Sequence, residues 1–155
     1  MLSLNEKAPD FKLHNTEKQE ISLAEQRGSN VVLLFFPLAF TGVCTAELCS
    51  VRDNISLYNN TNAKVFGISV DSLFSLKKFK EEQNLNFDLL SDFNKETSTA
   101  YDCLYPQFGF GMMGVSKRSA FVIDKNGILK YAEVLEKAGD LPNFEAISKV
   151  LEDLK

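Results

Sequence analysis

The sequence predicts an α/β domain in which helices cover a mixed central sheet. Two observations support this class: strand-like and helix-like segments alternate along the chain, and a hairpin signal follows near its end. Alternating strands and helices are typical of a layered sheet with parallel neighbours. The late hairpin adds antiparallel strands, so the sheet is expected to be mixed. We take the 155 residues as one domain, 1–155, a common domain size.

The predicted strands come from apolar runs. The runs "VVLLFF" (Val31–Phe36) and "AKVFGISV" (Ala63–Val70) suit strands buried on both faces. "FDLLSD" (Phe87–Asp92) predicts a shorter strand. "SAFVID" and "ILKYAEV" flank Lys125-Asn126-Gly127, and Asn-Gly between two strand patterns is a strong hairpin signal.

The predicted helices come from apolar side chains at helical spacing. Four helices are expected: Val43–Tyr58, a helix capped by Asp71 or Ser72 that runs to about Gln83, Asn94–Tyr101, and Pro142–Leu154 with the proline in its first turn.

Charge and hydropathy argue against two classes of protein, those that bind nucleic acid and those that span a membrane. Seventeen basic and 21 acidic residues give a net charge of -4, which makes a nucleic-acid-binding surface unexpected. The longest apolar run is interrupted by Pro37 and is too short to span a membrane. The N-terminus lacks the charged lead and apolar core of a secretory signal, so we expect a cytoplasmic protein.

Three cysteines in such a chain argue against a structural disulfide framework, because cytosolic disulfides are usually transient and catalytic. Metal binding also fits poorly. The spacing C-x4-C of Cys44 and Cys49 is not a usual zinc spacing, and the single histidine, His14, lies far away in sequence. The sequence indicates no metal, haem, flavin or nicotinamide cofactor.

The stretch "GFGMMG", Gly109–Gly114, matches the dinucleotide-binding pattern G-x-G-x-x-G. That pattern needs a preceding strand and a following helix, whereas a strand pattern follows here. We interpret the stretch as a glycine-rich loop. Its side chains Phe108, Phe110, Met112 and Met113 suit a pocket wall, a subunit interface or simple core packing.

Cys44 occupies the position where active sites of α/β sheets tend to lie. It follows a predicted strand end in "FFPLAFTGVC" and opens a predicted helix. Unpaired N–H groups and the helix dipole favour an anion there, such as a thiolate. Thr41 and the N–H groups of Val43 and Cys44 are candidates for stabilising developing charge, and Pro37 for shielding the thiolate. The alternative is that Cys44 is a small buried apolar residue.

The order of motifs resembles the peroxiredoxin family along essentially the whole chain. The motifs are "NEKAPDF", with Asn5 where glycine is more usual, "VVLLFFP", P-x-x-x-T-x-x-C at Pro37–Cys44, "VFGISVDS", and "KRSAFVIDKNGILKYA". Within the family, the chain most resembles two branches: the bacterioferritin-comigratory (Q) type and the E type. This resemblance implies a thioredoxin-like fold and a thiol peroxidase that reduces hydrogen peroxide and organic hydroperoxides.

The resemblance also implies roles for individual residues. Cys44 would be the peroxidatic cysteine, which is oxidised to sulfenic acid. Thr41 would hydrogen-bond the peroxide, and Pro37 would pack over the thiolate. Arg118 would hold the thiolate and bind peroxide, although by itself it reads as a surface charge at the start of a strand. Glu47 would orient Arg118, although an acidic residue also suits a first helical turn.

Cys49 lies where some relatives carry the resolving cysteine, which would form a disulfide with Cys44 and be reduced by a thioredoxin-type dithiol. On an intact helix, residues five apart have Cα atoms about 8.6 Å apart. A disulfide tolerates at most about 7 Å. We therefore expect Thr45–Ser50 to unwind during turnover. The alternative is a buried Cys49 and an external thiol reductant. Cys103 is expected to be a packing residue, with resolution as a lesser option.

Two further classes of function stay open at this point. A thioredoxin-fold disulfide oxidoreductase would normally carry C-x-x-C, which the chain lacks. A non-catalytic redox sensor on the same fold would oxidise at Cys44 without rapid turnover. The sequence leaves open whether the protein is a monomer or a homodimer.

Overall fold

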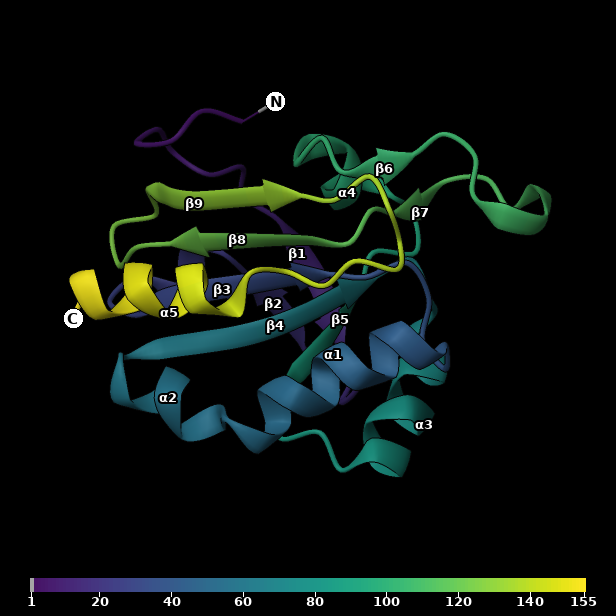
Figure 1. Ribbon diagram of the computed structural model, residues 1–155, viewed down its shortest axis with the longest axis horizontal. Coiled ribbons are helices and arrows are strands. Elements are labelled where there is room, and N and C mark those ends of the chain that lie inside the picture. Colours follow the sequence, from purple (N-terminus) through teal and green to yellow (C-terminus); the bar gives the residue numbers. More distant parts are fainter. Residues whose placement is uncertain (1) are drawn as a thin grey trace.

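A seven-stranded sheet forms the centre of the computed structural model, which describes residues 2–155 (Figure 1). The strand order is β2-β1-β5-β4-β3-β8-β9, and β3, β4 and β5 are parallel while the other neighbours are antiparallel. The predicted mixed sheet is confirmed. The strands are β1 (Lys12–Asn15), β2 (Glu20–Ser22), β3 (Asn30–Phe35), β4 (Ala63–Ser69), β5 (Asp88–Ser91), β8 (Ser119–Ile123) and β9 (Leu129–Val134). A separate pair consists of β6 (Leu104–Tyr105) and β7 (Val115–Ser116).

Strand β3 is the centre of the core, and all six of its residues are buried. Its side chains alternate between the two faces of the sheet, as the strand geometry requires. Val32 and Leu34 pack into one hydrophobic cluster, and Val31, Leu33 and Phe35 into the other. The prediction of a strand buried on both faces is therefore confirmed.

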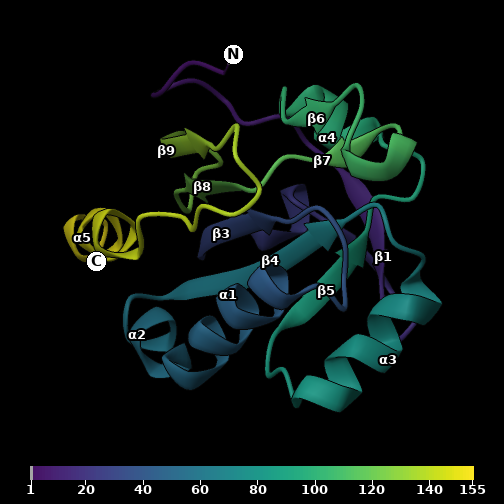
Figure 2. The same ribbon diagram turned by 45° about the vertical axis from the view of Figure 1, so that its right-hand side comes forward.

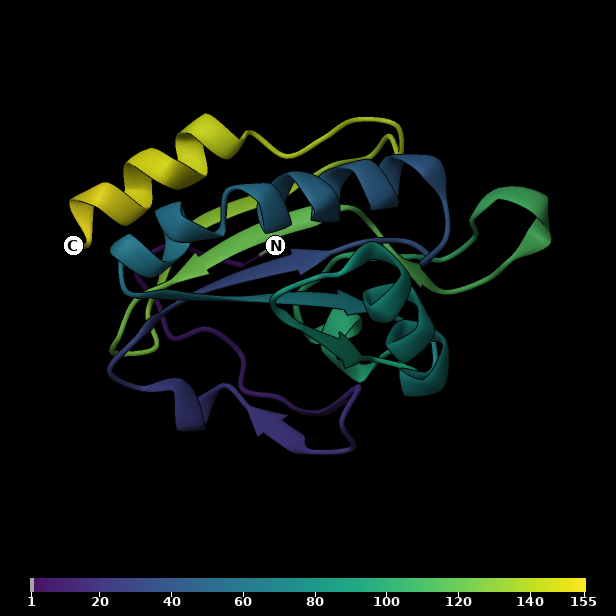
Figure 3. The same cartoon turned by 90° about the horizontal axis from the view of Figure 1, so that it is seen from below.

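Helices cover the two faces unequally. The helices are α1 (Gly42–Asp53), α2 (Ile55–Asn60), α3 (Leu73–Gln83), α4 (Glu96–Ala100) and α5 (Phe144–Asp153), with 3-10 turns at Ala24–Gln26 and Gly109–Gly111. Side chains of α1, α2, α3 and α5 belong to one hydrophobic cluster. Figures 2 and 3 show α1, α2 and α5 on one side of the sheet and the N-terminal segment on the other. In the described part of the chain, none of these helices is long and apolar enough to cross a bilayer.

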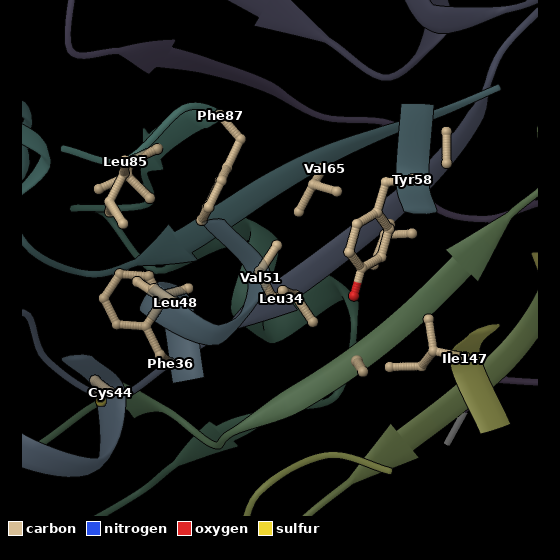
Figure 4. Close-up of a cluster of buried hydrophobic side chains, with 14 of the residues drawn as sticks. Leu34, Phe36, Cys44, Leu48, Val51, Tyr58, Val65, Leu85, Phe87 and Ile147 are labelled. Carbon is tan, nitrogen blue, oxygen red and sulfur yellow. The ribbon is translucent and has the colours of Figure 1, made fainter. Parts of the chain in front are cut away.

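Helix α1 points its apolar side chains at the sheet. Figure 4 shows Leu48 and Val51 of α1 among Leu34 and Phe36, with Cys44 at one end of the same cluster. Packing along this face anchors the helix, so the position of Cys44 is set by the apolar residues that follow it in α1.

The prediction of one continuous helix over Val43–Tyr58 is wrong. The structure divides the expected Val43–Tyr58 helix at Asn54, whose backbone angles of φ -117° and ψ 24° are not helical. The Asn54 side chain donates to the carbonyl of Ser50 at 2.8 Å, and its backbone N–H bonds Val51 at 3.1 Å. Asparagine competes well for such local bonds, which explains the break that the apolar spacing did not reveal.

The other predicted elements are largely confirmed. Ser72 caps α3 by accepting from the N–H of Ser75, and the strands around Asn126-Gly127 form the expected hairpin. Helix α5 begins later than expected, because Asn143 accepts from the N–H of Ala146 and caps it. Pro142 therefore precedes the helix. The short N-terminal strands β1 and β2 were not predicted.

Candidate active site

Cys44 lies in the first turn of α1, just beyond the C-terminal end of β3. Thr41 is the N-cap residue, so the N–H groups of Gly42, Val43 and Cys44 have no partner four residues earlier in the helix. Cys44 as a residue is 1% exposed. The buried sulfur therefore lies at the N-terminal end of α1, where the helix dipole is positive.

Arg118 contacts the sulfur of Cys44 from outside α1. Its Nη2 donates to Cys44 Sγ at 3.3 Å, and its Nη1 donates to Glu47 Oε1 at 2.7 Å. Nε and Nη2 also donate to the carbonyl of Ala138, at 3.2 Å and 2.9 Å. Arg118 immediately precedes β8, and β8 pairs directly with β3, which explains why its side chain reaches the end of β3. The single guanidinium thus connects α1 with the loop between β9 and α5.

Glu47 and Arg118 form a fully buried ion pair. Burial raises the pKa of Glu47 to about 7, and the attraction of Arg118 offsets this rise only in part. Burial opposes the charged form of Arg118, but Glu47 and Cys44 outweigh it and raise the arginine's pKa. Glu47 Oε2 has no hydrogen-bond partner among the described residues. The geometry therefore favours a fixed Arg118 guanidinium beside the sulfur. It is held by Glu47, which does not line the pocket.

A pocket of about 210 Å³ has Cys44 in its lining. Its lining contains six residues that the sequence singled out, together with four neighbours: Pro37, Leu38, Thr41, Gly42, Val43, Cys44, Phe108, Arg118, Ala138 and Gly139. The space suits a small substrate, with the cysteine and the arginine both in its wall.

Thr41 is oriented within this wall by the loop that carries it. Its hydroxyl donates to the carbonyl of Leu38 at 2.9 Å. Because that bond uses the hydroxyl's proton, the oxygen is left as an acceptor for an incoming O–H group. Pro37 is buried beside the same pocket.

The glycine-rich loop contributes one side chain to the pocket. Phe108 lines it, whereas Phe110, Met112 and Met113 are exposed at 101%, 38% and 71%. Core packing is therefore excluded for these three residues. Sequence reasoning missed the carbonyl of Ala138 as a partner of Arg118, and no side-chain pattern marks a backbone acceptor.

Cys49 lies on the same helix but away from the pocket. Both cysteines fall inside the intact α1, and both are free thiols. Cys49 is half-buried and donates to Gln83 Oε1 of α3 at 3.4 Å. The helical separation of about 8.6 Å between the Cα atoms therefore applies to this structure.

Cys103 is fully buried and lies on the other side of the sheet. It belongs to the cluster that contains Phe35 and Phe121, while Cys44 belongs to the cluster that contains Leu48. Burial raises the pKa of Cys103 to about 12. Its surroundings agree with the predicted packing role and separate it from Cys44 by the sheet. His14 is exposed on β1, outside the pocket.

The sequence profile of the AhpC/TSA family matches residues 4–132, which is most of the chain. The chain belongs to the AhpC/TSA family. This peroxiredoxin is 37% identical over 137 residues to alkyl hydroperoxide reductase E of Mycobacterium tuberculosis, covering 86% of each chain. It is 37% identical over 130 residues to peroxiredoxin Bcp of Bacillus subtilis, covering 83% of this chain and 82% of the relative.

Solved structures agree with this assignment. The peroxiredoxin superposes on peroxidoxin BcpB of Mycobacterium tuberculosis with a TM-score of 0.88 at 25% identity, covering 100% of this chain and 99% of the other. The thioredoxin-like peroxiredoxin fold is thereby confirmed, and relatives from both of the resembled branches match the chain. The chain is a peroxidase enzyme of this family.

Proposed function

We propose that Cys44 is the peroxidatic cysteine of a thiol peroxidase for hydrogen peroxide and organic hydroperoxides. The observation that carries this proposal is the 3.3 Å contact between Arg118 Nη2 and Cys44 Sγ at the wall of a pocket. The thiolate attacks the nearer peroxide oxygen, the O–O bond breaks, and a proton converts the departing oxygen into water or an alcohol. Cys44 becomes a sulfenic acid.

Arg118, Thr41 and Pro37 support this step in different ways. Arg118 donates hydrogen bonds to the thiolate and to the peroxide, and so stabilises charge as the O–O bond lengthens. Thr41 accepts the peroxide O–H and aligns the bond with the sulfur. Pro37 keeps water from the sulfur. Glu47 orients Arg118, and the N–H of Val43 stabilises negative charge at the helix start.

Cys49 is proposed as the resolving cysteine. The sulfenic acid of Cys44 condenses with the Cys49 thiol, which forms the disulfide and releases water. The two Cα atoms, about 8.6 Å apart on the helix, must approach to within about 7 Å, so Thr45–Ser50 unwinds first. A dithiol of the thioredoxin type then reduces the disulfide. One relative, from Drosophila melanogaster, is named thioredoxin-dependent peroxide reductase; it is 36% identical, covering 96% of this chain and 64% of the relative.

Two alternatives make different predictions. A one-cysteine peroxidase would reduce Cys44 with an external thiol, and a redox sensor would oxidise once without rapid turnover. Both alternatives leave Cys49 without a chemical role. The variant Cys49→Ser tests this point directly. The proposed cycle requires reduced thiols and so fits the cytosol, and it operates equally in a monomer or a homodimer.

The test follows peroxide consumption with thioredoxin, thioredoxin reductase and NADPH. Cys44→Ser should abolish turnover, and Cys103→Ala, the matched control, should retain it. Cys49→Ser should stop after one round with thioredoxin and accumulate the sulfenic acid, while the wild type forms an internal disulfide detectable by mass spectrometry. Full activity of Cys44→Ser would exclude the proposal. The same internal disulfide in Cys49→Ser would exclude Cys49 as its partner.

A further inference from the structure

The loop Pro37–Thr41 has an unusual conformation for the residues it contains. Phe40 adopts a φ of 67°, in the left-handed region that a bulky side chain seldom occupies. Such a conformation persists where surrounding contacts hold it. The loop also supplies Pro37, Leu38 and Thr41 to the pocket. Whatever holds this loop therefore determines where the Thr41 hydroxyl lies.

Main-chain hydrogen bonding between β3 and β4 ends just before the loop Pro37–Thr41 begins. Strand β3 pairs with β4 up to Phe35, and the N–H of Phe36 makes one more bond to the carbonyl of Ile68, at 3.0 Å. Beyond Phe36 the chain leaves β4. A hydrogen bond to the side chain of Asp71, which lies just past the end of β4, links the two segments again.

Asp71 binds the middle of the loop through one carboxylate oxygen. Oδ2 accepts from the N–H of Ala39 at 2.8 Å and from the hydroxyl of Ser69 at 2.6 Å. The carboxylate is itself fixed, because the N–H of Asp71 donates to Ser69 Oγ at 3.2 Å and the Asp71 carbonyl accepts from Ser91 Oγ at 2.6 Å. Hydrogen bonds to a carboxylate are stronger than those between neutral groups.

A second contact reinforces the loop on the side of α3. The ring of Phe40 packs edge-on against Phe79, with 5.2 Å between ring centroids. Phe79 is fully buried, so it provides a fixed surface. Asp71 therefore holds Ala39 and Phe79 holds Phe40, which together fix the two residues immediately before Thr41.

We propose that Asp71 is a positioning residue of the peroxidase, which holds the Pro37–Thr41 loop so that Thr41 faces the peroxide bound at Cys44. This inference rests on the proposed role of Cys44. Asp71 is absent from the pocket wall, so it acts through the loop and not on the substrate. The prediction specific to such a role is that peroxide reduction suffers while the intrinsic reactivity of the thiol does not.

The experiment compares two reactions of Cys44 in the same Cys49→Ser, Cys103→Ala background. Stopped-flow measurement gives the second-order rate constant with hydrogen peroxide, and alkylation by iodoacetamide reports on the thiol without needing Thr41. Asp71→Ala should lower the peroxide rate constant by about tenfold to a hundredfold, the range that misplacement of about 1 Å produces. Its alkylation rate should stay within about twofold, because Arg118 and the helix start are untouched.

Three other variants serve as a conservative replacement, a second way to weaken the same contact, and a control. Asp71→Asn keeps an oxygen that accepts from Ala39, so it should restore the peroxide rate constant to within about threefold of the parent. Ser69→Ala, which removes one support of Asp71, should lower it by about threefold and serves if Asp71→Ala does not fold. Asp88→Ala removes a carboxylate that pairs with Lys80 at 3.6 Å and should leave both rates unchanged.

The outcomes separate this inference from the proposed function. A parent protein that fails to reduce peroxide at Cys44 would overturn the proposed function. A parent that reacts, with a folded Asp71→Ala of equal peroxide rate constant, would overturn the role of Asp71. An equal loss of peroxide reduction and alkylation would also overturn it, because the defect would then be general. If Asp71→Ala does not fold, an unchanged peroxide rate constant in Ser69→Ala decides against the role.

Discussion

The Nη2 of Arg118 lies 3.3 Å from the sulfur of Cys44, although 74 residues separate the two in sequence. The contact exists because β8 pairs with β3 and so brings the residue before one strand to the end of the other. The same guanidinium binds Glu47 and Ala138, which restricts it to a single position. The site therefore depends on one side chain that serves three acceptors.

Replacing Arg118 by lysine should lower the rate constant for peroxide by about a hundredfold or more. Lysine keeps the positive charge, but a single ammonium cannot contact the sulfur, Glu47 and Ala138 with the geometry of a guanidinium. Stopped-flow oxidation by hydrogen peroxide measures the effect, with Arg27→Lys on the exposed surface as the control. An Arg118→Lys rate constant within about twofold of wild type would contradict the role of this geometry.

Glu47 should make the protein less stable as the pH rises through the weakly acidic range. Its pKa is about 7 in the folded protein against an ordinary value of 4.5, so between these values the folded state holds a proton that the unfolded state has lost. Raising the pH then lowers the free energy of unfolding, by up to about 3 kcal/mol. Below pH 4.5 both states are protonated and the effect disappears.

Urea unfolding of wild type and Glu47→Gln across this pH range measures that contribution. The variant should show a flatter dependence, because residue 47 no longer titrates. Glu82→Gln, at an exposed position of α3, is the control and should follow the wild type. Parallel curves for wild type and Glu47→Gln would show that burial does not perturb this carboxyl group in the folded protein.

Gln83 should slow the opening of α1. Its Oε1 accepts from the Cys49 thiol, and this bond must break before Cys49 reaches Cys44. Gln83→Met keeps the side-chain length but removes the amide acceptor. A loss of about 0.5 to 1 kcal/mol should speed disulfide formation by about twofold to fivefold.

The rate is measured by quenching the protein at intervals after one equivalent of peroxide and counting disulfide by mass. Gln19→Met, which alters an exposed glutamine beside β1, is the matched control. Equal rates in wild type and Gln83→Met would show that breaking the bond to Gln83 does not limit the opening of α1.

Cys103 should resist alkylation in the folded protein. It is fully buried, and burial raises its pKa to about 12, so little thiolate exists near neutral pH. Iodoacetamide should label Cys44 through the pocket and half-buried Cys49, and should label Cys103 after unfolding in urea. Peptide mass mapping identifies the sites. Rapid labelling of Cys103 in the native protein would contradict its assignment to the core.

The local pattern of the chain predicted most of the sheet and helices, because apolar runs and helical spacing report directly on burial. It predicted less well where polar side chains redirect the backbone. Asn54 interrupts a helix whose apolar spacing is continuous, and Asn143 moves the start of α5 past Pro142. Strands β1 and β2 are short and partly exposed, so they lack the apolar run that identified the others.

The sequence by itself determined that Pro37, Thr41 and Cys44 lie together, because they share one loop and one helix start, and it marked Arg118 and Glu47 through their place in the motifs. The tertiary structure decided how these groups meet. It placed Arg118 between Cys44 and Glu47, set Cys103 on the opposite face of the sheet, and tied Ala39 to Asp71. Such contacts depend on strand order and on which face each side chain occupies, and neither is encoded in the spacing of residues along one segment.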